Sequence, residues 1–129
     1  MIRLIRSPGR LEYTLFIAMS GFLLDHSITQ WILNNFVGFS ESNTRLNPQL
    51  GLPLMVFGYI LGDLTLPKTK TFNLLLYTLS LMHWTGPIQD ILVFFNVING
   101  LNFIYSVPLI AICTFITMYL VVPNRTPRI

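Results

Sequence analysis

The chain has 129 residues, of which 53% are hydrophobic and only 10% are charged. Because soluble domains average about 25% charged residues, this composition argues against an ordinary soluble domain. The formal net charge of +3 comes from basic residues near the chain ends and in one turn, so it does not indicate a nucleic-acid partner. Long apolar blocks without β-type alternation predict helices in lipid. We therefore predict an all-α fold: an integral membrane four-helix antiparallel bundle, with residues 1–129 as a single transmembrane domain.

The first predicted span covers residues 11–33. The preceding residues include Arg3, Arg6 and Arg10, which resembles the start of a secretory signal, but the apolar run is too long for a cleaved one. Four polar residues lie in the second half of this apolar span. An ionisable group at the centre of a spanning helix costs about 2.5–3.5 kcal/mol, so such groups usually face other helices or a water-filled cavity. The four residues are Asp25, His26, Thr29 and Gln30.

The second predicted span covers residues 48–66 and follows the longest loop. Asn47 and Pro48 form a helix-start pair, with asparagine at the cap and proline at the first helical position. Asp63 lies near the far end of this span. We expect it to pair at the membrane interface with Lys68 or Lys70.

The third predicted span covers residues 71–98, with Thr69 or Thr71 as its cap. Gly86 and Pro87 lie in its middle, where a proline removes a backbone hydrogen bond and kinks a helix. One bent helix is the first interpretation. Two half-helices broken at residues 85–87 are the alternative. The fourth predicted span covers residues 102–122.

The distribution of basic residues predicts the topology. Four spans place seven of the eight Lys and Arg residues on one side, and only Arg45 on the other. Because positive charge marks the cytoplasmic side, both termini are expected in the cytoplasm, and the protein in the cell membrane as a multi-pass protein.

Helical spacing places the intramembrane polar residues on particular faces. At about 100° per residue, Asp25 and Thr29 share one face, and His26 and Gln30 lie about a quarter-turn away. On the third span Ser80, His83 and Asp90 share a face. Trp84 is deep in that span, so its N–H needs a partner. The predicted polar cluster is Asp25, His26, Thr29, Gln30, Ser80, His83 and Asp90.

Four interpretations of this cluster stay open. The side chains can join helices by hydrogen bonds. They can form a proton or ion path. His26 and His83 are candidate metal ligands, together with Asp25 and Asp90, although no spacing here is diagnostic. Asp25, His83 and Asp90 are candidate acid–base groups for a lipid-soluble substrate. No residue is assigned a catalytic or metal role, and the cofactor is unknown.

Two stretches resemble known families. Asp25-x3-Thr29, followed by Glu41 and by Asn47-Pro48, resembles a D-x3-T…E…N-P pattern in small, uncharacterised prokaryotic membrane proteins. The stretch from Pro87 to Phe95 resembles part of the membrane lycopene cyclases, with Gln89 at the position of the first acidic residue. This second resemblance implies acid–base chemistry on a long polyene, with Asp90 as the matching acid.

The expected function rests on what the sequence lacks. It has no cofactor motif and no complete catalytic set, so an accessory subunit of a larger membrane complex is the first expectation. A membrane-embedded enzyme acting on an isoprenoid or lipid is the alternative, and a proton, ion or transport component is the third. The expected partners are the lipid bilayer and other membrane subunits or further copies of the chain. An enzyme predicts a pocket lined by Asp25, His83 and Asp90, whereas an accessory subunit predicts a filled bundle.

Overall fold

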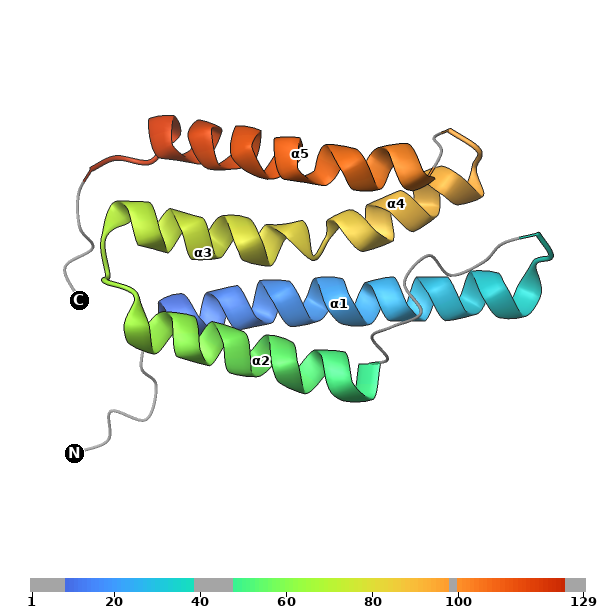
Figure 1. Ribbon diagram of the computed structural model, residues 1–129, viewed down its shortest axis with the longest axis horizontal. Coiled ribbons are helices and arrows are strands. Elements are labelled where there is room, and N and C mark those ends of the chain that lie inside the picture. The colour runs from blue at the N-terminus through green and yellow to red at the C-terminus, as the bar shows by residue number, and fades with distance from the viewer. Residues whose placement is uncertain (1–8, 39–47, 98–99, 125–129) are drawn as a thin grey trace.

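The computed structural model describes residues 9–38, 48–97 and 100–124, and every regular element in these ranges is a helix. The helices lie as four antiparallel rods, since α3 and α4 follow each other along one line (Figure 1). The all-α four-helix bundle is therefore confirmed. Among the described residues no helix has both the length and the apolar composition needed to cross a membrane. The helices are α1 (Arg10–Asn35), α2 (Pro48–Thr65), α3 (Lys70–Met82), α4 (Thr85–Phe94) and α5 (Gly100–Val121).

Helix α1 lies inside the array. It packs against α2 on one side and against α3 and α4 on the other, while α5 covers the outer side of α3 and α4 (Figure 1). The buried residues of its first half are small, Thr14, Ala18 and Gly21, at helical spacing. Small side chains allow neighbouring helices to approach closely. The central position of α1 therefore depends on this small-residue stripe.

The third rod consists of two helices, so the prediction of a single bent helix is wrong. The half-helix alternative is correct in kind, but the break lies at His83 and Trp84 and not at the predicted residues 85–87, which begin α4. Helix α3 ends at Met82 and α4 begins at Thr85. At the break the His83 and Trp84 amides donate to carbonyls three residues back, at 3.3 and 3.0 Å. Pro87 is the third residue of α4, where a backbone N–H has no intrahelical partner in any case. Proline therefore starts the new helix instead of kinking an old one.

The ends of the third rod are fixed by local chemistry. Thr69 caps α3, as one of the two predicted caps, and accepts a hydrogen bond from the Phe72 amide at 3.5 Å. Helix α4 ends at Phe94, earlier than the predicted residue 98, because Asn96 adopts a left-handed conformation with φ 58°. The Asn96 and Val97 amides then satisfy the last carbonyls of the helix, in a Schellman arrangement.

Arg10 joins α1, α2 and α3 at one end of the bundle. Its guanidinium donates to Asp63 Oδ1 at 2.7 Å and to Asn73 Oδ1 at 3.0 Å. It also donates to the carbonyls of Asp63, Leu66 and Pro67, at 2.8, 3.0 and 3.0 Å. The prediction that Asp63 pairs with Lys68 or Lys70 is therefore wrong. The start of α1 lies beside the end of α2, so the planar guanidinium reaches both the carboxylate and the unpaired carbonyls there.

Candidate functional site

The break between α3 and α4 lies directly against α1. A Cβ atom built on Gly21 would lie 2.9 Å from the backbone carbon of His83 and 2.9 Å from Cδ1 of Trp84. One turn earlier, the Ile17 carbonyl accepts a hydrogen bond from Trp84 Nε1 at 2.9 Å. The predicted need of Trp84 for a partner is thus met by the backbone of α1. Glycine at position 21 lets the two backbones meet at the break.

Asp25 lies one turn beyond Gly21, and its carboxylate packs on the first turn of α4. A Cβ atom built on Gly86 would lie 2.6 Å from the Asp25 Cγ and 2.8 Å from each carboxylate oxygen. The N-terminus of a helix carries partial positive charge, which stabilises a neighbouring anion. The break therefore creates a local environment suited to a carboxylate in the middle of the bundle.

Thr29, one further turn along α1, binds the other candidate acid. Its hydroxyl donates to Asp90 Oδ2 at 2.7 Å. The two acids of the predicted cluster therefore lie at different points along the α1–α4 contact: Asp25 at the first turn of α4, and Asp90 beside Thr29. The pairing of Thr29 and Asp90 fits the helix-joining interpretation of these two residues.

Replacing Thr29 by valine is expected to lower the free energy of unfolding by about 1–2 kcal/mol. Valine keeps the side-chain volume, but the Asp90 carboxylate loses the hydroxyl that donates a hydrogen bond to it. Thermal unfolding in a mild detergent measures the effect. Ser27→Ala is the control, since that exposed hydroxyl bonds only within α1, to the Leu23 carbonyl. Equal stability of Thr29→Val and the wild type would show that the bond contributes nothing.

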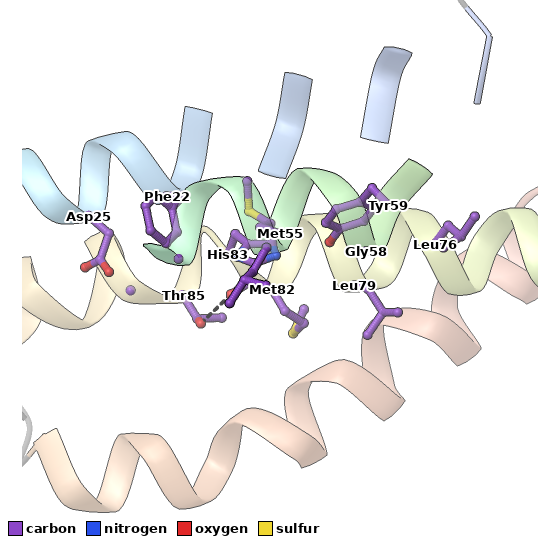
Figure 2. Close-up of a pocket in the computed structure, with 13 residues that line it drawn as sticks. Phe22, Asp25, Met55, Gly58, Tyr59, Leu76, Leu79, Met82, His83 and Thr85 are labelled. Carbon is purple, nitrogen blue, oxygen red and sulfur yellow. Dashed lines mark hydrogen bonds between the residues drawn. The ribbon is translucent and has the colours of Figure 1, made fainter. Parts of the chain in front are cut away.

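Beside the break lies an open cavity of about 770 Å³, the central groove (Figure 2). Asp25 and Thr85 lie toward one end in that view, and Leu76 and Leu79 toward the other. In the same view Phe22 lies beside Asp25 and Tyr59 lies near Leu79, so polar and apolar side chains are interspersed along the groove. Its lining residues are Phe22, Asp25, Gly51, Leu54, Met55, Gly58, Tyr59, Leu76, Leu79, Met82, His83, Thr85 and Gly86.

Two of the three candidate acid–base residues line the groove, and one does not. Asp25 and His83 are part of the lining, whereas Asp90 is not. Ser80 is fully buried and donates to the Tyr77 carbonyl at 2.7 Å. His26 and Gln30 are half-buried on α1 and are not part of the lining. The structure therefore divides the predicted cluster. Asp25 and His83 line the groove, Thr29 binds Asp90, and the other three residues belong to neither pair.

The sequence interpretation missed several groove residues. Tyr59 of α2 is buried, and its ring centroid lies 5.8 Å from that of His83. Thr85 donates to the Met82 carbonyl at 2.6 Å, across the helix break. Gly58 opens the groove, since a Cβ built there would meet nothing within 4 Å. A signal for Thr85 existed, because it precedes the Gly-Pro pair, but nothing marked Tyr59 or Gly58.

The candidate metal ligands do not gather into a metal centre. Within residues 9–38, 48–97 and 100–124, no three or more His, Cys, Asp or Glu side chains are arranged to hold a metal ion. His83 lies at the helix break and lines the groove, whereas His26 does not line it.

Comparisons with models of protein families, with curated proteins and with solved structures each found no match. The geometry and chemistry of the groove are therefore the observations from which a function can be inferred.

Proposed function

We propose that the protein lies in a membrane and binds a lipid-soluble amphiphile in the central groove. The observation that carries this proposal is the composition of the groove, whose lining is mostly apolar and includes a few polar side chains, among them Asp25, Tyr59 and His83. Ligand pockets are mostly apolar cavities of about 300–1,000 Å³ with a few polar groups that orient the ligand. The groove, at about 770 Å³, has that size and composition.

The outer surface supports the membrane part of the proposal. Large apolar side chains are exposed on every helix, among them Phe16 on α1 at 73%, Phe57 on α2 at 63% and Leu120 on α5 at 78%. Monomeric proteins in water seldom expose large contiguous apolar patches. A bilayer covers such a surface and also supplies amphiphiles from the side. The predicted topology, with both termini in the cytoplasm, belongs to the same proposal.

Asp25 and His83 are the groups available for acid–base chemistry on a bound isoprenoid or lipid. Both line the groove, and the break between α3 and α4 fixes both positions. A carboxylate and an imidazole can accept or donate protons in general acid–base catalysis. In this proposal they bind and orient the polar group of the amphiphile. Asp90 is paired with Thr29 and has no part in it.

Filling the groove tests the proposal. Gly58→Phe places a ring in the groove from a position with open space beyond its Cβ. We expect saturable binding of tritium-labelled dodecanol to the purified wild type in maltoside detergent, and at least a tenfold weaker affinity in Gly58→Phe. The variant should fold, because replacing a helical glycine removes a cost of about 0.5–1 kcal/mol.

The matched control is Leu64→Phe, on the same helix at a side chain that is 77% exposed. It introduces the same ring outside the groove and should bind dodecanol as the wild type does. Absence of saturable binding to the wild type would contradict the proposal, and so would equal affinity in Gly58→Phe and Leu64→Phe.

The accessory-subunit function is the second candidate, favoured by the outer face of α5. Its exposed side chains repeat at helical spacing and form one apolar strip on the side away from α3 and α4, which another membrane protein would cover. The strip consists of Tyr105, Leu109, Ile112, Ile116 and Leu120. In this case the protein would be recovered in a complex of fixed stoichiometry with other subunits.

A further inference from the structure

Tyr59 of α2 is a buried polar residue in the lining of the central groove. It is 7% exposed, and its ring centroid lies 5.8 Å from that of His83. Figure 2 shows its oxygen on the side of the ring that faces His83. A tyrosine in this position offers a ligand both an aromatic wall and a hydroxyl group.

Among the described residues the Tyr59 hydroxyl has no hydrogen-bond partner. In that part of the chain every fully enclosed side-chain oxygen or nitrogen does have one, so this hydroxyl borders open space, and Tyr59 lines the groove. Two further hydroxyls near the break are already bonded, since Thr85 donates to the Met82 carbonyl and Ser80 to the Tyr77 carbonyl. The Tyr59 hydroxyl is therefore available to a ligand that accepts a hydrogen bond.

Aromatic and thioether side chains line the same groove. Phe22 of α1, Tyr59 of α2 and His83 at the helix break contribute rings, and Met55 and Met82 contribute thioethers. Aromatic rings pack on one another in offset or edge contacts, and sulfur atoms contact aromatic rings favourably. A planar unsaturated ring gains both kinds of contact, whereas a saturated group gains only the burial of its apolar surface.

On this basis we infer that Tyr59 is a ligand-binding residue, whose hydroxyl donates a hydrogen bond to a carbonyl oxygen of the amphiphile. The amphiphile carries this carbonyl on a planar ring, as aryl ketones and quinones do. The ring packs against Tyr59 and His83, and the alkyl chain lies along apolar residues such as Leu76 and Leu79. This inference rests on the proposed function, because it assigns the ligand chemistry of the same groove.

Competition against labelled dodecanol tests the inference with three matched neutral probes. Decyl phenyl ketone has both the ring and the carbonyl. Undecylbenzene has a methylene group in place of the carbonyl, and decyl cyclohexyl ketone has a saturated ring in place of the planar one. With affinities expressed per mole fraction in the micelle, we expect decyl phenyl ketone to compete at least about fivefold more strongly than either. Equal competition by all three, or a preference for either of the others, would overturn the inference.

Tyr59→Phe removes only the hydroxyl and so locates the hydrogen bond. We expect it to bind decyl phenyl ketone about fivefold more weakly and undecylbenzene as the wild type does. Its thermal unfolding should be unchanged, because the hydroxyl has no partner in the described part of the protein. Tyr105→Phe is the matched control, at a side chain of α5 that is 81% exposed, and it should bind both probes normally.

The variants also give results that would overturn the assignment. Unchanged binding of decyl phenyl ketone in Tyr59→Phe would do so, and so would an equal loss of affinity for both aromatic probes, since that would mean altered packing. Failure of dodecanol to bind the wild type contradicts the proposed function itself. Dodecanol binding without any preference among the three probes contradicts only this inference.

Discussion

Replacing Arg10 by alanine is expected to lower the free energy of unfolding by about 3–5 kcal/mol, the largest effect expected of any single substitution in this chain. The guanidinium side chain is 6% exposed and that of Asp63 is 15% exposed. Removing the cation leaves a largely buried carboxylate and the last carbonyls of α2 without their donor. Thermal unfolding in a mild detergent, followed by circular dichroism, measures the loss.

Arg10→Lys separates charge from geometry. Lysine keeps the positive charge but lacks the planar fork that reaches several acceptors at once, so we expect a loss intermediate between wild type and Arg10→Ala. Lys68→Ala is the control for removing an exposed cation from the same end of the bundle, and it should change stability by less than about 0.5 kcal/mol. If Lys68→Ala were as unstable as Arg10→Ala, the assignment of Asp63 to Arg10 would be wrong.

The second large effect is expected from Gly21→Leu, which should cost about 3 kcal/mol or more. Its Cβ would lie 2.9 Å from the backbone carbon of His83, and the backbone at the break cannot yield as a flexible side chain would. Loss of this contact separates α1 from the third rod and also displaces Asp25. The same thermal unfolding measurement applies.

Gly58→Leu is the matched control, since it makes the same change in a helix at a position with open space around its Cβ. We expect it to be as stable as the wild type or slightly more stable, because glycine is unfavourable inside a helix. If both variants lost a similar amount of stability, the cause would be a general property of these helices. The contact of Gly21 with the break would then not explain why glycine is needed there.

Apart from the third rod, the sequence was sufficient to predict where the helices lie, and local chemistry explains why. Apolar block lengths, the Thr69 cap and the positions of the prolines are all local signals, and the observed helices follow them. A break was predicted only as an alternative, and at residues 85–87 instead of at His83 and Trp84. A proline is compatible with either a kinked helix or a new first turn, and contacts with Gly21 and Trp84 favour the new turn here.

The site was predictable only in part, because it depends on which faces meet. Helical spacing correctly grouped Asp25 with Thr29 on the side of α1 that faces α4. It could not show that Thr29 binds Asp90 while Asp25 remains at the groove. Arg10 and Asp63 are 53 positions apart in the sequence, so their pairing depends on the arrangement of the rods. Gly58 matters through the space it leaves open, which has no signature in one sequence.

The most direct test of the central claim is native mass spectrometry of the protein extracted from its own membranes in a mild detergent. The proposed function predicts one bound amphiphile per chain in the wild type and its loss in Gly58→Phe. A particle that contains other subunits at fixed stoichiometry and no amphiphile in the wild type would contradict the groove account and support the accessory-subunit function.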